Sequence, residues 1–170
     1  MEKINEKERI MMEEILEILE KNARASEEEI ALMLNKSVGE VQAAIKKLEE
    51  DNIIVGYNTL INWDKSSKEN VTALIEVKVT PQRGQGFDKV AERIYRYPQV
   101  KACYLMSGGF DLTVIIEGNS MKEVALFVAE KLAPLESVLS TATHFVLKKY
   151  KDEGVVFEEK GKDDREALIL

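Results

Sequence analysis

The chain has 170 residues, of which 45% are hydrophobic and 32% charged, ordinary shares for a soluble globular protein with one or two domains. No apolar run approaches the roughly 20 residues of a membrane-spanning helix, and the charged first residues lack the apolar core of a signal peptide. The single cysteine, Cys103, excludes an intramolecular disulfide, and with one histidine it argues against structural zinc. We expect a cytoplasmic protein without metal, cofactor or membrane contact.

The first fifty residues predict three short helices. Apolar residues at helical spacing indicate a first helix over about residues 5–22. Ser26 and Glu29 have the spacing of a capping box, which indicates the start of a second helix. Ser37 and Glu40 repeat this signal at the start of a third helix, after a tight turn.

The segment after the third helix, residues 53–63, is rich in β-prone residues and is interrupted by Gly56. It predicts a short wing or linking strand. Three helices with a tight turn between the last two, followed by a β-wing, make a winged helix-turn-helix. We expect this domain over residues 1–63, followed by a polar hinge over residues 64–70.

The hydrophobic period then changes from helical to alternating. The odd positions from Val71 to Val79 are all apolar and predict a strand with one buried face. We expect next a helix that ends before Pro98, two strands joined by a turn, a helix capped by Ser120, and a final strand over residues 140–150.

This βαββαβ order is that of a ferredoxin-like sandwich, which places the whole chain in the α+β class. We expect this domain over residues 71–150 and a charged C-terminal tail over residues 151–170. One face of such a sheet is open, and Leu74, Cys103 and Leu105 are predicted to lie on it. An open apolar strip predicts dimerisation, with two recognition helices about one DNA turn apart.

Charge is distributed unevenly between the two predicted domains. Residues 1–64 hold eight Lys and Arg against fifteen Asp and Glu, whereas residues 65–170 hold sixteen of each. The net charge of −7 therefore lies in the half that looks DNA-binding. Local charge near the groove counts more than the domain total, so this excess does not exclude DNA.

Three stretches resemble the Lrp/AsnC family of feast/famine transcriptional regulators. Residues 15–57, with "NAR", "KLEEDNII" and "GY", are similar to its DNA-binding half. "SGGFDLTVIIEG" resembles a signature turn of its effector domain, and "VLSTATHFVLKKYK" resembles the last strand of that domain. The resemblance covers about residues 9–151. It implies a regulator that binds double-stranded promoter DNA, assembles as a homodimer and further into a tetramer or octamer, and responds to a free amino acid.

The chain departs from the family pattern in two places. Recognition helices of the family commonly carry arginine where this chain has Ala43 or Ala44, which weakens phosphate contact or guanine reading. The turn usually carries an acidic residue where this chain has Gly109, which leaves the identity of the amino acid open.

The third helix carries the candidate DNA contacts. Gln42 can bond to adenine, while lysines and the hydroxyl of Ser37 can contact phosphates. The alternative is a DNA-inactive interaction protein, in which these lysines only face solvent. The expected DNA-binding residues are Lys36, Ser37, Gly39, Gln42, Ala43, Lys46 and Lys47.

The turn "SGGFD" carries the candidate effector contacts. Its glycines allow positive φ and close backbone approach, exposed amides there can hold a carboxylate, and Asp111 can pair with an ammonium group. The alternative is a plain hairpin turn, in which glycine serves geometry alone. The expected effector-binding residues are Ser107, Gly108, Gly109, Asp111, Ser140, Thr141 and Thr143.

An enzymatic alternative also exists. The chain has no Ser/His/Asp pattern, P-loop or HExxH motif. Some proteins with the same two-domain plan are haem-pathway decarboxylases of the sirohaem type, which hold a tetrapyrrole with basic and imidazole side chains. Arg93, Arg96 and His144 are the residues available for that role here.

Overall fold

The computed structural model describes residues 5–80 and 86–157. It divides into two compact units, Met1–Leu60 and Ile61–Leu170. Each unit has a hydrophobic core of its own.

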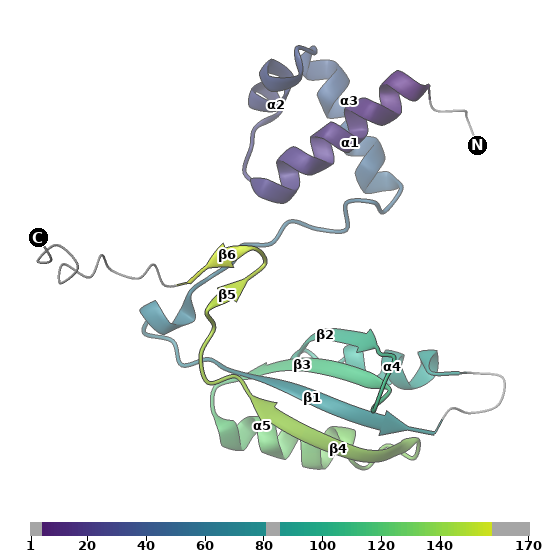
Figure 1. The fold of residues 1–170 in the computed structure, drawn as a ribbon, viewed down its shortest axis with the longest axis vertical. Helices are drawn as coiled ribbons and strands as arrows, with labels where there is room; N and C mark the ends of the chain where they lie inside the picture. Colours follow the sequence, from purple (N-terminus) through teal and green to yellow (C-terminus); the bar gives the residue numbers. More distant parts are fainter. Residues whose placement is uncertain (1–4, 81–85, 158–170) are drawn as a thin grey trace, which may run out of the picture. The chain divides into compact units, whose positions relative to one another are not determined.

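Unit 1 consists of three helices, α1 (Glu6–Lys21), α2 (Glu27–Leu34) and α3 (Val38–Glu50) (Figure 1). Both predicted capping boxes are present. The Ser26 amide donates to the Glu29 carboxylate at 2.8 Å, and the Ser37 amide donates to the Glu40 carboxylate at 2.9 Å. These boxes satisfy amides that a helix start leaves unpaired, which explains why α2 and α3 begin where the sequence predicts.

The tight turn between α2 and α3 depends on Asn35, which adopts a left-handed conformation with φ of 51°. Asparagine tolerates this region better than most residues, so α2 can end within one residue. The apolar faces of the three helices form one core, with Ile15, Ile30 and Val41 fully buried. The helix-turn-helix therefore rests on contacts among all three helices.

The predicted wing strand is not formed. Residues 53–62 contain no strand, and unit 1 offers no strand within its described residues to pair with them. A strand needs a partner for its backbone groups, which β-prone side chains do not supply. Instead, the Tyr57 hydroxyl donates to the Glu49 carboxylate of α3 at 2.9 Å, which fixes this segment beside α3.

Unit 2 contains a four-stranded antiparallel sheet with helices on one face (Figure 1). The elements of the sandwich are β1 (Val71–Val79), α4 (Asp88–Tyr95), β2 (Val100–Leu105), β3 (Leu112–Gly118), α5 (Met121–Phe127) and β4 (Val138–Phe145). The strand order is β2-β3-β1-β4, the order of a ferredoxin-like sandwich, so this prediction is confirmed. The helix α5 continues into one π-helical turn, Val128–Leu132.

The two faces of the sheet differ as the alternation in β1 predicts. Ala73, Ile75 and Val77 are fully buried against the helices. Leu74 lies on the other face, where it is paired with Ile115 of β3 and His144 of β4. Residues directly opposite in neighbouring strands share a face, so this open face can be followed across the sheet.

The prediction that Cys103 and Leu105 lie on the open face is wrong. They pair with the buried residues Val114 and Leu112, so they lie on the helix-covered face, and Tyr104 takes the open face. The register of β2 shifts between Val100 and Ala102. An extra residue at such a shift reverses the face of everything after it, which alternation in sequence cannot show. Burial raises the pKa of the Cys103 thiol, so this thiol is less reactive than an exposed one.

The C-terminal part of the chain differs from the expected tail. β5 (Lys151–Asp152) and β6 (Val155–Val156) form a short hairpin, whose turn contains Gly154 with φ of 79°. Residues 158–170 of the predicted tail lie outside the described residues. No helix among the described residues has the length and apolar character needed to cross a membrane.

Candidate nucleic-acid interface and ligand region

The outward side of α3 presents the polar residues that the sequence predicts to contact DNA. The opposite side of the helix, with Val41, Ala44 and Leu48, is buried in the core. A Cβ at Gly39 would meet nothing within 4 Å, so a partner can approach the helix backbone closely there. We call the following exposed residues the α3 surface: Lys36, Ser37, Gly39, Gln42, Ala43 and Lys46.

Lys47 is separated from this surface, although the sequence grouped it with Lys46. Its side chain is 35% exposed and turns toward α1, where Nζ lies 3.1 Å from Oε1 of Glu8. Residues 46 and 47 point about 100° apart around a helix, so only one of them can occupy the centre of the exposed side. Lys47 therefore joins α3 to α1 in this structure.

Carboxylates of the chain itself occupy most polar groups of the α3 surface. Nε2 of Gln42 donates to Oε2 of Glu27 at 2.5 Å, and Nζ of Lys46 lies 3.7 Å from Oε1 of Glu50. Lys46 and Glu50 are 76% and 66% exposed, so their ion pair is weak and a phosphate can replace Glu50. Glutamates thus lie beside the residues that would meet DNA.

Ser37 and Lys36 differ in whether a carboxylate of the chain already bonds to them. The Ser37 hydroxyl donates to Oε2 of Glu40 at 2.7 Å, and the Ser37 amide donates to the same carboxylate. Both hydrogen bonds lower the pKa of Glu40, and the hydroxyl contributes most. The hydroxyl is therefore engaged in the capping box. Among the described residues, Lys36 has no ion pair within 4 Å, which leaves its ammonium group available for a phosphate.

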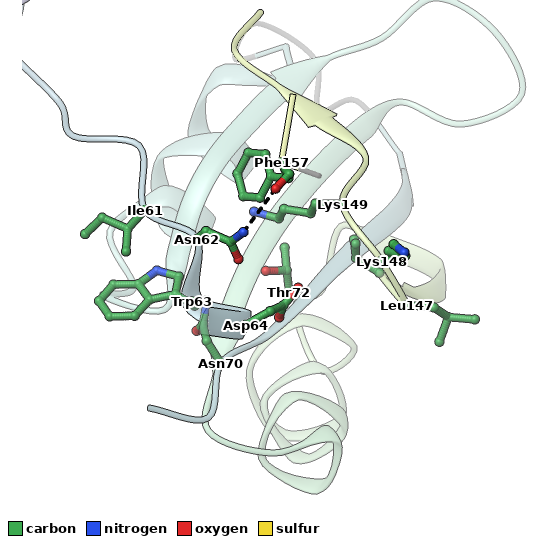
Figure 2. A pocket seen from close by; sticks show the side chains of 11 residues that line it. Ile61, Asn62, Trp63, Asp64, Asn70, Thr72, Leu147, Lys148, Lys149 and Phe157 are labelled. Atoms are coloured by element: carbon green, nitrogen blue, oxygen red, sulfur yellow. Dashed lines mark hydrogen bonds between the residues drawn. The ribbon is translucent and has the colours of Figure 1, made fainter. Parts of the chain in front are cut away.

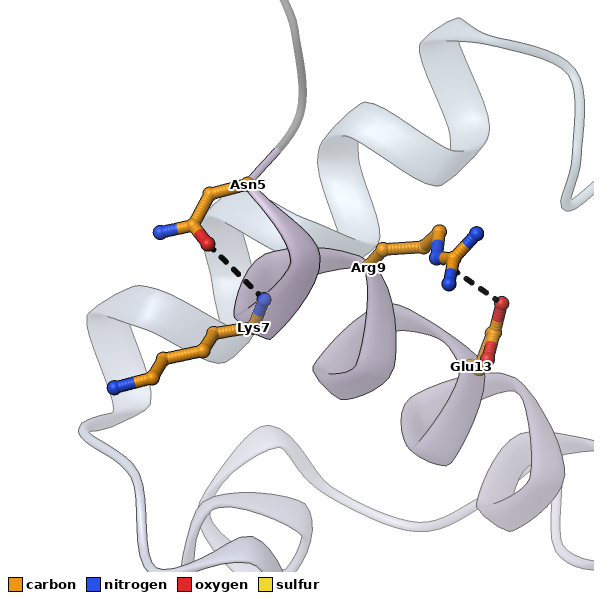
Figure 3. Close-up of polar contacts among 4 residues, drawn as sticks. All are labelled: Asn5, Lys7, Arg9 and Glu13. Atoms are coloured by element: carbon orange, nitrogen blue, oxygen red, sulfur yellow. Dashed lines mark hydrogen bonds and ion pairs between the residues drawn. The ribbon is translucent and has the colours of Figure 1, made fainter.

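A groove of about 470 Å³ separates the start of α1 from α3. Lys7 of α1 lines it together with Lys36 and Lys47, a grouping that the sequence analysis missed. Figure 3 shows the start of α1, where Asn5 accepts from the Lys7 amide at 3.1 Å and the Lys7 side chain extends away from the Arg9–Glu13 ion pair. The positions of these lysines in the sequence do not indicate that they lie together, because their grouping depends on how α1 packs against α3.

The turn that joins β2 to β3, residues 106–111, holds its aspartate in a backbone contact. Oδ2 of Asp111 accepts from the Val79 amide at 2.8 Å, next to a shift in register between Lys78 and Val79. Gly108 has φ of 142°, which favours glycine, whereas Gly109 shows no positive φ. The geometric role that the sequence assigned to both glycines therefore applies to Gly108. We call residues 106–111 the β2–β3 turn.

The three residues of the predicted effector set that belong to β4 lie on opposite faces of this strand. Ser140 is paired with Lys78 on the open face, whereas Thr141 and Thr143 are paired with Val77 and Ile75 on the helix-covered face. Side chains alternate along a strand, so one pocket within a single chain cannot use all three. Ser107, Gly108 and Gly109 are exposed.

The residues available for a tetrapyrrole do not converge. His144 lies on the open face of the sheet, where Nε2 is 3.3 Å from Oε1 of Glu76. Arg93 belongs to α4, which covers the other face, and Arg96 directly follows this helix and pairs with Glu92 within it. The geometry therefore argues against the decarboxylase alternative.

Unit 2 also contains a small polar cavity of about 40 Å³ that the sequence analysis missed (Figure 2). Nδ2 of Asn62 donates to the Phe157 carbonyl at 3.4 Å, while Oδ1 of Asn62 is buried and has no partner among the described residues. Thr72 and Lys149 also line the cavity, as Figure 2 shows. The space suits water rather than an amino acid.

Fold and surface together define a two-domain DNA-binding regulator with a helix-turn-helix and a ligand-binding domain. Residues 11–55 match a family model described as winged helix-turn-helix DNA-binding, and residues 72–156 match one described as Lrp/AsnC ligand binding domain. The chain belongs to the Lrp/AsnC family of transcriptional regulators.

Relatives with regulator names support this assignment. The chain is 54% identical over 168 residues, 98% of each chain, to the uncharacterized HTH-type transcriptional regulator YugG of Bacillus subtilis. It is 32% identical to the HTH-type transcriptional regulator LrpA of Pyrococcus horikoshii, over 87% of this chain and 99% of LrpA. These relatives are regulators by name, so the chain is a regulator rather than an enzyme.

Solved structures share the fold. The transcriptional regulator NMB0573 from Neisseria meningitidis, solved as a complex with L-methionine, superposes with a TM-score of 0.69 at 23% identity. The match covers 84% of this chain and 91% of that chain.

Proposed function

We propose that this regulator binds promoter DNA through the α3 surface, as a dimer or larger assembly, and that an amino-acid-like ligand modulates this binding. One observation carries the proposal. The α3 surface combines an open backbone at Gly39, a base-reading side chain at Gln42 and two lysines, Lys36 just before the helix and Lys46 within it. A helix with these groups suits the major groove.

The acidic excess of residues 1–64 is compatible with DNA binding because of where the charge lies. Glu13, Glu14 and Glu17 are on the exposed side of α1 rather than on the α3 surface. The carboxylates that do touch the α3 surface lower its affinity for a polyanion. We therefore propose weak binding by one subunit and useful affinity only when several subunits bind together.

The open face of the sheet supports assembly through unit 2. Leu74 and Ile115 lie on it, and Tyr104 is 56% exposed there. Among the described residues of unit 2, the helices pack on the opposite face of the sheet. A second copy of the same face would bury these residues and place two α3 helices on one side of DNA. Dimers could then assemble into a tetramer or octamer. Light scattering at micromolar concentration is expected to give at least a dimer, and a monomer would contradict the proposal.

The ligand part of the proposal rests on the domain type and on the β2–β3 turn. The turn has exposed backbone at Gly108 and Gly109, and among the described residues Oδ2 of Asp111 accepts from the Val79 amide. Exposed amides can hold a carboxylate, and the second oxygen of Asp111 can accept from an ammonium group. A free amino acid carries both groups. The L-methionine in the Neisseria meningitidis structure is a ligand of this kind.

A thermal-shift screen of the twenty amino acids tests the ligand. Asp111→Asn is the informative variant, because asparagine keeps a carbonyl that can accept from the Val79 amide but loses the negative charge. A ligand that stabilises the wild type and not the variant supports the site. Equal stabilisation of both proteins would exclude Asp111 as the anchor of the ammonium group.

Gel retardation of the DNA upstream of its own coding region tests the central part of the proposal. The wild type is expected to retard this fragment at low salt, and Lys36→Glu combined with Lys46→Glu is expected to abolish the retardation. Lys21→Glu combined with Lys122→Glu changes the net charge equally, at exposed positions outside the α3 surface. This control is expected to retain binding. Equal loss in both double variants would show that only the total charge matters.

A further inference from the structure

Gln42 is the one amide side chain of the α3 surface, and an amide can form two hydrogen bonds with adenine at once. Its amide bonds to Glu27, which belongs to the first turn of α2 and lies fifteen positions earlier in the chain. Nε2 of Gln42 lies 2.5 Å from Oε2 of Glu27, and the carboxylate acceptor makes this hydrogen bond charge-assisted. This contact joins the two helices of the helix-turn-helix at the surface that would meet DNA.

The contact determines which way the amide of Gln42 faces. A carboxylate only accepts hydrogen bonds, so it binds the Nε2 end of the amide and repels Oε1. Flipping the amide would place two acceptors against each other. Glu27 therefore fixes Oε1 and leaves the second hydrogen of Nε2 free for another partner.

We infer that Glu27 is a positioning residue for base recognition, and that it orients Gln42 to prefer adenine over guanine. The inference rests on the proposed function, namely that α3 lies in the major groove. Adenine presents an acceptor at N7 beside a donor at N6, which matches the remaining hydrogen and Oε1 of the oriented amide. Guanine presents two acceptors, N7 and O6, so Oε1 would face an acceptor.

Glu27 also explains a carboxylate that otherwise only opposes DNA binding. A negative charge in the first turn of α2 lowers affinity for any sequence, because it repels phosphates. Glu27 nevertheless increases sequence preference, because a Gln42 side chain that Glu27 did not hold could reorient to suit several bases. Removal of Glu27 should therefore raise affinity for random DNA and reduce discrimination at one position.

Selection of binding sites from a randomised DNA pool by the full-length protein tests the inference. The wild type is expected to enrich adenine over guanine by about tenfold at one position of each half-site. Gln42→Ala and Glu27→Ala are both expected to lose this preference while the rest of the motif remains. Glu28→Ala is the matched control, since Glu28 is an exposed neighbour in the same helical turn and its substitution removes the same charge.

The outcomes separate this inference from the proposed function. If the wild type enriches no sequence and retards no DNA, the proposed function fails. If the wild type enriches a motif and Glu27→Ala keeps the full preference, Glu27 does not position Gln42 and the inference is wrong. Loss of the preference in Glu28→Ala as well would assign the effect to charge alone and would also overturn it. Circular dichroism of each variant confirms that the helices are retained.

Discussion

The α3 surface and the β2–β3 turn both present polar side chains near glycine, but they use these side chains differently. In the turn, the Asp111 carboxylate accepts from a backbone amide of β1. On the α3 surface, Gln42 and Lys46 bond to other side chains at an exposed surface. A contact to backbone holds the fold together, whereas an exposed ion pair such as Lys46–Glu50 can be exchanged for a phosphate. Similar polar motifs in sequence can therefore serve stability in one place and binding in another.

The largest expected effect comes from introducing a carboxylate into each region in turn and comparing the DNA affinities of the two variants. Ala43→Glu places a negative charge at the centre of the α3 surface, and like charges across an interface cost several kcal/mol. We expect at least a hundredfold loss of DNA affinity for a dimer, measured by retardation. Gly109→Glu introduces the same charge in the β2–β3 turn, where φ is not positive. It should leave DNA affinity without ligand unchanged, and an equal loss would remove the distinction between the regions.

Asp111→Ala should mainly affect the stability of unit 2. It removes the acceptor of the Val79 amide, and an unsatisfied buried donor costs about 1–3 kcal/mol. Asp111→Asn keeps an acceptor and should retain most of that stability. Urea unfolding followed by fluorescence at Trp63, in unit 2, measures the difference. If alanine and asparagine were equally well tolerated, Asp111 would be free to serve a ligand alone.

The two glycines of the turn should respond unequally to alanine. Gly108 has φ of 142°, a conformation that side chains rarely adopt, so Gly108→Ala should lower the free energy of unfolding by about 1 kcal/mol. Gly109 has space for a Cβ and no positive φ, so Gly109→Ala should change stability little. Thermal unfolding of the pair gives the answer. A larger cost at Gly109 would contradict the conformation of this turn.

The smallest expected effect concerns the ion pair between Glu8 and Lys47. Glu8→Gln weakens a half-exposed contact, which should cost no more than about 1 kcal/mol of unfolding free energy. It also removes a negative charge from the groove beside α3, so DNA affinity should rise slightly. Fluorescence anisotropy with a labelled promoter fragment detects the change. Weaker DNA binding in a fully folded variant would show that Glu8 supports the interface.

The sequence predicted local features of the fold better than distant ones. Ser26 and Ser37 mark helix starts correctly because a capping box lies within four residues. The face of Cys103 was wrong because it depends on a register shift in β2, which only the pairing with β3 reveals. The wing strand was predicted from β-prone residues, but strand formation depends on a partner that local sequence does not show.

The candidate site follows the same rule. The sequence predicted Gln42 and Lys46 to face outward from their spacing on α3, which needs no knowledge of other helices, and both are exposed. It did not identify Glu27 as the partner of Gln42, or Glu8 as the partner of Lys47, because those contacts depend on packing between helices. The partner of Asp111 is thirty-two positions away in the chain. Pairwise contacts at such separations decide which polar residues remain available.

The salt dependence of DNA binding tests most directly whether the α3 surface is the interface. The slope of the logarithm of affinity against the logarithm of salt concentration counts neutralised phosphates, at about 0.9 per contact on duplex DNA. We expect Lys46→Gln to reduce this slope by roughly one per bound subunit, and Lys47→Gln to leave it unchanged, because Lys47 pairs with Glu8. An unchanged slope for Lys46→Gln, or an equal reduction for Lys47→Gln, would contradict the account.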